Sequence, residues 1–204
     1  MTFDHITPIY DRLARAIFGK AIFRSQIVHF NRIKSDARIL IPGGGTGWIL
    51  HHLPPDCKEV VYVDSSLNMI EKARKLNVQF PVTYYHACIE NTNLNGKFEI
   101  VIANFFFDLF TEEEVERIVR IVDSNLTSSG ILLVSDFRNT GIWWQRILLA
   151  IMYLFFRIVA GMPAKRLADW KNILIKNGFI SISETTYCHD FIVSEIFCKS
   201  NFNS

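Results

Sequence analysis

The chain has 204 residues, 50% of them hydrophobic, with 22 basic and 20 acidic side chains. This length and apolar content suit one domain with a full hydrophobic core, and they exclude a disordered chain. A net charge of +2 is too small for a nucleic-acid-binding surface, so we expect no nucleic-acid partner.

Helix-like and strand-like segments alternate along the chain, as a parallel α/β sheet requires. Residues 8–34 have a helical pattern with a break near Gly19. Strands are then predicted at 37–41, 59–63, 82–86, 98–103 and 131–135, with helices at 47–53, 66–76 and from 111 onward. Two further helices are predicted at 142–159 and 163–177. Asn177-Gly178 is a typical end for the second of these.

The helix after the fourth strand has a clear start signal. Thr111 with Glu114 three positions later forms a capping box, and acids fill the first turn. The run Glu112–Glu114 therefore predicts a helix start rather than a cluster of catalytic carboxylates.

Residues 142–161 are strongly apolar, but two arginines leave only ten uncharged residues between them, Ile147–Phe156. Ten helical residues cannot cross roughly 30 Å of hydrocarbon, so we expect no transmembrane segment. A buried helix or a helix at a membrane surface fits better, which leaves a peripheral membrane contact open. In the membrane case we expect Leu148 and Phe155 to contact lipid.

Two apolar, β-branched runs, 179–187 and 191–198, are separated by only three residues, which predicts an antiparallel hairpin. With the five earlier strands, the hairpin predicts an α/β fold. It is a three-layer α/β/α, Rossmann-like arrangement around a seven-stranded, mostly parallel sheet with a C-terminal antiparallel hairpin. We expect a single domain over residues 1–204, with an N-terminal helical cap at 1–34.

The most informative segment is ILIPGGGTGW, residues 39–48, where an apolar strand ends in glycines. Such a turn brings bare backbone N–H groups close to a ligand. A second strand follows and ends in Asp64, an acid that can bind a pair of ribose hydroxyls. The two features together predict a cofactor that contains adenosine.

The glycine spacing separates the possible cofactors. A nicotinamide-dinucleotide motif, G-x-G-x-x-G, would need glycine at Trp48 or Leu50, and no nearby lysine completes a phosphate loop. The chain has G-x-G-x-G instead, at Gly43, Gly45 and Gly47. An ordinary glycine-rich turn is the alternative interpretation.

This pattern resembles motif I of the class I S-adenosylmethionine (SAM)-dependent methyltransferases. The resemblance covers roughly Tyr10 to Cys198 and is closest to small bacterial enzymes related to the ubiquinone/menaquinone-biosynthesis methyltransferases. VDSSLNMIEKAR, residues 63–74, resembles a second segment of that group, and the C-terminal hairpin is typical of the class I sheet. The resemblance implies SAM as cofactor, with S-adenosylhomocysteine as product.

The resemblance also implies roles for single residues. Asp64 would bind the ribose hydroxyls, and Ser65 and Met69 would flank the adenine. Ile89 would stack on the adenine, and Asn104 would line the methyl-donor pocket. The implied cofactor-binding residues are Gly43, Gly44, Gly45, Thr46, Gly47, Asp64, Ser65, Met69, Cys88, Ile89 and Asn104.

Two positions depart from the family pattern. Pro42 stands where the family has an acid that orients the amino end of the cofactor. Cys88 stands where an aspartate accepts from the adenine amino group, and a thiol is a poor substitute. These departures motivate a second hypothesis, in which the chain is a non-catalytic SAM- or S-adenosylhomocysteine-binding module or a regulatory partner subunit.

Methyl transfer needs mainly alignment and a dry pocket, so a catalytic acid–base pair is not required. Asp108 is a candidate base that would orient or deprotonate the acceptor, although such a residue also caps loops, and Asp136 is similar. Tyr10 is a second catalytic candidate, since an aromatic face over the donor methyl favours a cation. It is equally explained as a helix-packing residue.

The acceptor is expected to be a small, apolar or aromatic molecule. Aromatic side chains gather after the fourth and fifth strands, and residues 142–177 are expected to line the acceptor side. Any single one of them is more readily explained as core. The expected lining residues are Phe105, Phe106, Phe107, Trp143, Trp144, Tyr153, Phe155 and Phe156.

The remaining expectations concern metals and location. The four cysteines form no C-x-x-C pair and show no metal-ligand spacing with the six histidines, so we expect no metal. The first residues, MTFDHITPIYD, lack the pattern of a secretion signal. We therefore expect a cytoplasmic protein with reduced thiols, either a monomer or a homodimer.

Overall fold

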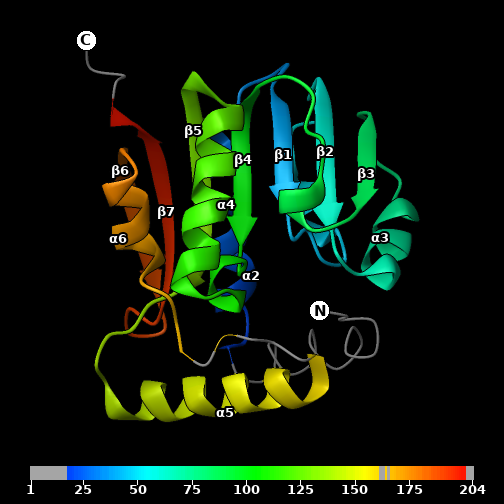
Figure 1. The fold of residues 1–204 in the computed structure, drawn as a ribbon. Helices are drawn as coiled ribbons and strands as arrows, with labels where there is room; N and C mark the ends of the chain where they lie inside the picture. The colour runs from blue at the N-terminus through cyan, green and yellow to red at the C-terminus, as the bar shows by residue number, and fades with distance from the viewer. Residues whose placement is uncertain (1–17, 161–163, 165, 201–204) are drawn as a thin grey trace.

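The computed structural model describes residues 18–160, 164 and 166–200. Seven strands form one sheet in the order β3-β2-β1-β4-β5-β7-β6, and β7 runs antiparallel to both its neighbours (Figure 1). The strands are β1 (Arg38–Pro42), β2 (Glu59–Asp64), β3 (Val82–His86), β4 (Phe98–Asn104), β5 (Leu126–Phe137), β6 (Phe179–Tyr187) and β7 (Ile192–Lys199). This order confirms the predicted Rossmann-like sheet and its C-terminal hairpin.

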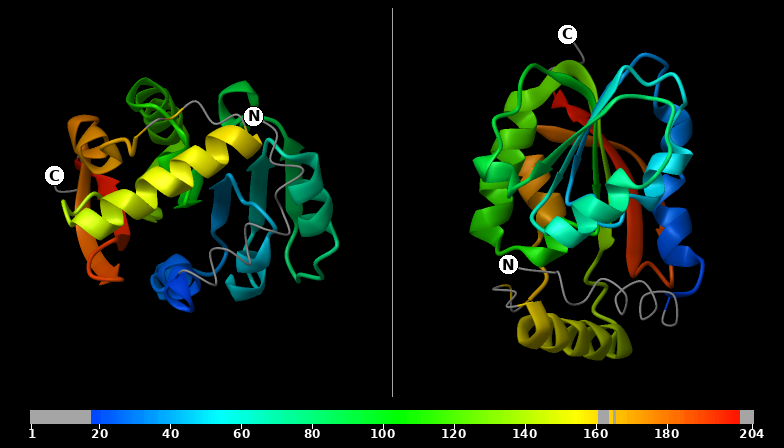
Figure 2. Two further views of the ribbon diagram at one scale, coloured as in Figure 1. Left: turned by 90° about the horizontal axis from the view of Figure 1, so that it is seen from below. Right: turned by 90° about the vertical axis from the view of Figure 1, so that its right-hand side faces the viewer.

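Helices cover both faces of the sheet, and one helix lies outside these layers. The α-helices are α2 (Ala21–Ile27), α3 (Leu67–Arg74), α4 (Glu112–Asn125), α5 (Trp143–Ala160) and α6 (Trp170–Lys176). Short 3-10 helices are η1 (Phe30–Arg32), η2 (Trp48–His52), η3 (Ile89–Asn91) and η4 (Phe107–Leu109). Figures 1 and 2 show α5 crossing below the sheet, at the edge where β1 to β4 end.

The central strands divide their side chains between two cores. Leu40 of β1 and Val101 of β4 join a cluster under α4 and α6. Ile39 and Ile100, the preceding residues, join a second cluster with α3 and η2. Successive strand residues point to opposite faces, so a strand covered on both sides must be apolar throughout. This requirement explains the continuous hydrophobic runs that predicted these strands.

The capping box at the start of α4 is confirmed. The Glu114 N–H donates to the Thr111 hydroxyl at 3.4 Å, and the Thr111 N–H donates to the Glu114 carboxylate at 2.8 Å. Two of the otherwise unpaired N–H groups of the first turn are thereby satisfied.

Three predicted boundaries were wrong. The helix predicted at 163–177 begins at Trp170, where the Asp169 side chain accepts from the Asn172 N–H and so fixes the start. The helix predicted at 47–53 is the 3-10 helix η2, too short between Gly47 and Pro54 for an α-helical ladder. Strand β5 begins at Leu126 rather than 131. Its first residues include the polar sequence TSSG, which has no apolar strand pattern, so the sequence did not predict this part of the strand.

The N-terminal helical prediction is tested only in part. Within the described residues, the region 18–34 contains α2 and η1, and it breaks near Gly19 as predicted. Residues 1–17 lie outside the described part of the chain, and with them the catalytic candidate Tyr10.

Replacing Thr111 should test whether its side chain stabilises the N-terminus of α4. We expect Thr111→Ala to lower the free energy of unfolding by about 1 kcal/mol, because one backbone donor loses its acceptor. Urea unfolding of the two proteins measures the difference. Thr111→Ser keeps the hydroxyl and is the control, so an equal loss in both variants would contradict the capping role.

Candidate functional site

The glycine-rich loop leaves β1 and turns into η2 at the carboxyl edge of the sheet. Gly43, Gly45 and Gly47 all have left-handed backbones, with φ of 61°, 65° and 80°. The Gly43 N–H donates to Val63 O at 2.8 Å, so the loop starts tied to β2. Residues with a Cβ rarely adopt these angles, which is why the loop needs glycine at alternate positions.

Two aromatic rings occupy the inner side of this loop. A Cβ on Gly43 would overlap the ring of Phe106, and a Cβ on Gly44 would overlap the ring of Tyr62. By contrast, no heavy atom of the described residues lies within 4 Å of the place that a Cβ on Gly45 would take. The loop therefore rests on aromatic side chains inside and leaves room for a ligand outside, at Gly45.

Asp64, the last residue of β2, holds the loop in place. Its carboxylate accepts from the Gly45 N–H at 2.8 Å with one oxygen and from the Ser66 N–H at 2.8 Å with the other. The Tyr62 hydroxyl donates to Gly45 O at 2.7 Å. Burial and the nearby Asp64 charge raise the pKa of Tyr62, so the phenol remains a donor.

Residues predicted to flank an adenine lie beside Asp64. The Ala87 N–H donates to Asp64 O at 3.0 Å, which brings the segment with Cys88 and Ile89 to the end of β2. Cys88 is exposed, whereas Ile89 and Met69 are only 4% and 8% exposed.

Ser65 and Thr46 are half-buried, as are the first glycines of the loop. The structure thus brings the sequence-predicted residues of the loop, β2 and η3 to one edge. The remaining one, Asn104, ends β4 and donates to Gln26 O at 3.4 Å.

The chain leaves β4 through a strained residue. Phe105 has φ of 47° although it is not glycine, and its N–H donates to Ser135 O at 2.6 Å. Left-handed backbone costs a residue with a Cβ on the order of 1 kcal/mol, and such strain gathers at functional sites. The turn directs the next residues, Phe106 to Asp108, back beneath the edge of the sheet.

Two buried carboxyl groups meet after this turn. One Asp136 oxygen accepts from the N–H groups of Phe107 and Asp108, at 3.0 and 3.2 Å, and the other accepts from the Phe137 N–H at 2.7 Å. Among the described residues no donor reaches Asp108 Oδ1, although it is fully enclosed.

Burial raises the pKa of Asp108 to about 7, and burial together with the Asp108 charge raises the pKa of Asp136. Two adjacent buried carboxyl groups do not both ionise readily. The pair therefore holds at least one proton near neutral pH.

The aromatic residues that were expected to line the acceptor site lie in different parts of the structure. Phe105 and Tyr153 share a cluster under α5 with Phe137 and Phe191, and the Tyr153 hydroxyl donates to Asp108 O at 2.8 Å. Phe107 instead stacks on Trp170 in the central core, with ring centroids 6.4 Å apart, and Phe106 covers Gly43. Trp143 is 72% exposed. These last three residues are not part of the cluster that contains Phe105.

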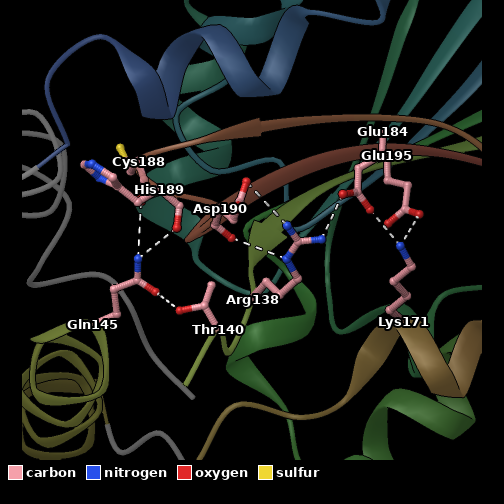
Figure 3. A network of polar contacts seen from close by, with 9 residues as sticks. All are labelled: Arg138, Thr140, Gln145, Lys171, Glu184, Cys188, His189, Asp190 and Glu195. Carbon is pink, nitrogen blue, oxygen red and sulfur yellow. Dashed lines mark hydrogen bonds and ion pairs between the residues drawn. The ribbon is translucent and has the colours of Figure 1, made fainter. Parts of the chain in front are cut away.

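A polar network fixes the start of α5 to the β6–β7 turn (Figure 3). The Gln145 side chain is 1% exposed and donates to Cys188 O and His189 O, at 3.4 and 3.0 Å. Cys188, His189 and Asp190 all have left-handed backbones, with φ of 53°, 56° and 62°. Arg138 donates to Asp190 O of the same turn at 3.3 Å and to the Glu184 carboxylate of β6 at 2.8 Å. The strained turn is thus held from two sides, and α5 is held with it.

Some features of the site had no clear signal in the sequence. Tyr62 and Phe106 support the loop because of where their rings lie. The hydrophobic pattern of a strand does not predict such positions. Within the described ranges, no group of three or more His, Cys, Asp or Glu side chains is placed to hold a metal ion.

Comparison with known sequences finds a match in the central region. Residues 39–130 match a family model described as a methyltransferase domain. Malonyl-acyl-carrier protein O-methyltransferase of Anoxybacillus flavithermus is 27% identical over 139 residues. That alignment covers 67% of this chain and 48% of the other protein, so the chain spans about half the length of the curated relative it matches.

Solved structures share the architecture over most of the chain. N-methyltransferase NodS of Bradyrhizobium japonicum, in complex with S-adenosylhomocysteine, has a TM-score of 0.62 and 12% identity, over 87% of this chain and 83% of NodS. The DhpI–SAH complex has a TM-score of 0.65 and 13% identity, over 97% of this chain and 93% of DhpI. Identities this low establish the fold alone, a Rossmann-like arrangement that these two proteins share with the chain.

The buried acid pair predicts a pH dependence of stability. Burial raises the pKa of Asp108 from 3.8 to about 7, so between these values the folded state holds a proton that the unfolded chain has released. Stability therefore falls as the pH rises through this window. We expect a loss of roughly 2–4 kcal/mol in unfolding free energy in the wild type.

Asp108→Asn should remove this part of the slope, because the amide does not titrate. Urea unfolding of wild type and variant between about pH 4 and about pH 8 gives the two slopes. Parallel curves for the two proteins would contradict the raised pKa.

Proposed function

We propose that this chain transfers a methyl group from SAM to a small, apolar or aromatic acceptor. The match of residues 39–130 to a methyltransferase domain and the fold shared with S-adenosylhomocysteine complexes support this proposal. The observation that carries the proposal is the open space at Gly45. It lies between a glycine loop held rigidly from inside and the acid that ends β2.

The residues at this edge fit the cofactor. The free space above Gly45 admits a ligand against bare backbone, and SAM has no pyrophosphate that would need a longer anion-binding turn. The Gly45 and Ser66 N–H groups donate to the two Asp64 oxygens and hold this carboxylate beside the loop. An acid at the end of the second strand is the kind of residue that binds the ribose hydroxyls of an adenosine-containing cofactor.

When bound, SAM would supply an electrophilic methyl group on a sulfonium: the acceptor would attack the methyl carbon in line, and the sulfur–methyl bond would break to release S-adenosylhomocysteine. The protein contributes alignment and the exclusion of water. The cluster of Phe105, Leu149 and Tyr153 under α5 supplies an apolar boundary on the side of β4 and β5. That composition supports an apolar or aromatic acceptor.

Asp108 is proposed as the base for an acceptor that must lose a proton. Its free oxygen has no donor among the described residues, and its raised pKa of about 7 makes it half-ionised near neutrality. Tyr153 holds the Asp108 backbone, and Asp136 holds its N–H, so the carboxyl group is fixed in position.

A second candidate function is favoured by Pro42. This residue is buried in β1, paired with Val63, at the position where the resemblance implies a cofactor-orienting acid. A chain that binds the cofactor without aligning its methyl group would act as a SAM- or S-adenosylhomocysteine-binding module. Cofactor binding without methyl transfer to any acceptor would support this alternative.

Calorimetric titration with SAM, S-adenosylhomocysteine and NAD tests the cofactor assignment. We expect binding of the first two and none of the third. Gly45→Val should abolish SAM binding, because its side chain would fill the open space above the loop.

The matched control is Gly141→Val. Gly141 also has a left-handed backbone, with φ of 80°, and no heavy atom of the described residues lies within 4 Å of the place of its Cβ. The variant carries the same backbone cost away from the glycine loop and should keep SAM affinity. Near-normal SAM affinity in folded Gly45→Val would show that the loop assignment is wrong.

The proposed base predicts a pH profile for turnover. The rate of labelled-methyl transfer from SAM into a small-molecule extract should rise between about pH 6 and about pH 8, because Asp108 must be ionised to accept a proton. Asp108→Asn should lose about a hundredfold in rate and show no rise through pH 7, while SAM affinity stays unchanged. An unchanged rate in the variant would exclude Asp108 as the base and leave cofactor binding as a separate question.

A further inference from the structure

Helix α5 turns an apolar face to solvent. Four large side chains on it are about half exposed or more: Trp143 at 72%, Ile147 at 52%, Ile151 at 59% and Leu154 at 49%. Their spacing of four, four and three residues places them along one side of the helix, over about 16 Å. The other side, with Leu149 and Tyr153, packs on the protein.

The same region concentrates positive charge. Residues 137–168 contain five basic side chains and no acid, in a chain whose total net charge is +2. Arg138 and Arg166 are paired with acids elsewhere on the protein. Arg146 and Arg157 lie exposed near the two ends of α5, close to the apolar face.

Within the described ranges, the position of α5 leaves this face exposed. The helix lies outside the three layers, across the edge where the parallel strands end (Figures 1 and 2). Of the helices that the structure describes, none is sufficiently long and apolar to span a bilayer. Because the inner side of α5 packs on the protein, its outward side, with tryptophan and aliphatic side chains flanked by arginines, resembles the membrane-facing side of a helix that lies in the plane of a membrane surface.

We propose that the outward face of α5 docks the protein on an anionic lipid surface. The apolar side chains would enter the boundary between headgroups and acyl chains, and Arg146 and Arg157 would contact anionic headgroups. Leu148 and Phe155, the lipid contacts expected from the sequence, are instead half-buried against the cluster beneath the helix.

The charges favour a lipid surface over a second copy of the chain. In a symmetric antiparallel pairing about the centre of α5, Arg146 would face Arg157 of the other copy. In a parallel pairing each arginine would face its own counterpart. The helix has no acid to compensate either arrangement, so like charges would oppose the pairing, whereas anionic headgroups would neutralise them.

Docking would turn the carboxyl edge of the sheet toward the bilayer. The cluster beneath α5 contains both Tyr153 and Phe105, which lie at the proposed acceptor side. If the proposed methyl transfer is correct, on which this step rests, the acceptor class is an apolar molecule that partitions into membranes.

Co-sedimentation of the full chain with vesicles tests the docking surface. We expect binding to vesicles of phosphatidylcholine with phosphatidylglycerol, weaker binding to phosphatidylcholine alone, and loss of binding as salt is raised. The double variant Ile147→Glu/Ile151→Glu should bind at least about tenfold more weakly, since two apolar contacts are replaced by anions. Arg146→Gln/Arg157→Gln should lose most of the preference for phosphatidylglycerol.

The control variant is Ile180→Glu/Ile182→Glu on edge strand β6, where the two side chains are 40% and 57% exposed. It adds the same charges far along the chain from α5 and should bind vesicles like the wild type. All variants should keep their SAM affinity in vesicle-free calorimetry, so failure of cofactor binding and failure of docking are separate results.

Two results would overturn the docking proposal. One is wild-type protein that stays in the supernatant with both kinds of vesicle. The other is a wild-type dimer, seen by analytical ultracentrifugation, that Ile147→Glu/Ile151→Glu dissociates and that shows no vesicle binding. The second result would assign the face to a copy of the chain.

Discussion

The proposed cofactor site depends on how the glycine-rich loop is supported from below. The Tyr62 and Phe106 rings lie where side chains on Gly44 and Gly43 would be, and Asp64 accepts from the Gly45 N–H. These contacts hold the loop from below, and among the described residues they leave open space at Gly45. A loop so constrained can receive a ligand without first being ordered, which lowers the entropic cost of binding.

Several costly features gather at the same edge of the sheet. Phe105 has a left-handed backbone, Asp108 and Asp136 are buried together, and the β6–β7 turn has three left-handed residues in succession. Each is stabilised by a neighbour: Ser135 accepts from the Phe105 N–H, and Gln145 donates to the turn. The rest of the sheet, apolar and regularly paired, provides the stability that allows this local strain.

Helix α5 links these features through its two faces. Its inner face covers the aromatic cluster and reaches Asp108 through Tyr153, while its outer face carries exposed isoleucines and arginines. A helix that is apolar nearly all round is expected to be buried on all sides. Here only one side is covered by the described chain, and this mismatch between composition and burial points to a further contact.

The sequence by itself determined the type of sheet, which is Rossmann-like and mostly parallel, together with the glycine loop and the closing hairpin. The hydrophobic pattern of each helix or strand and the spacing of the glycines are local features of the sequence. Each depends on a physical requirement that acts within a few residues. It also determined the cap of α4, for the same reason. It missed the true starts of β5 and α6, where polar residues hid a strand and an N-cap decided a helix boundary.

Only the tertiary structure decided which aromatic side chains share a site. Phe105, Phe106 and Phe107 are consecutive, yet one lies under α5, one covers Gly43 and one stacks on Trp170. It alone showed that Asp108 and Asp136 meet, and which side of α5 is exposed. These outcomes depend on contacts between residues far apart in the chain, which no local pattern encodes.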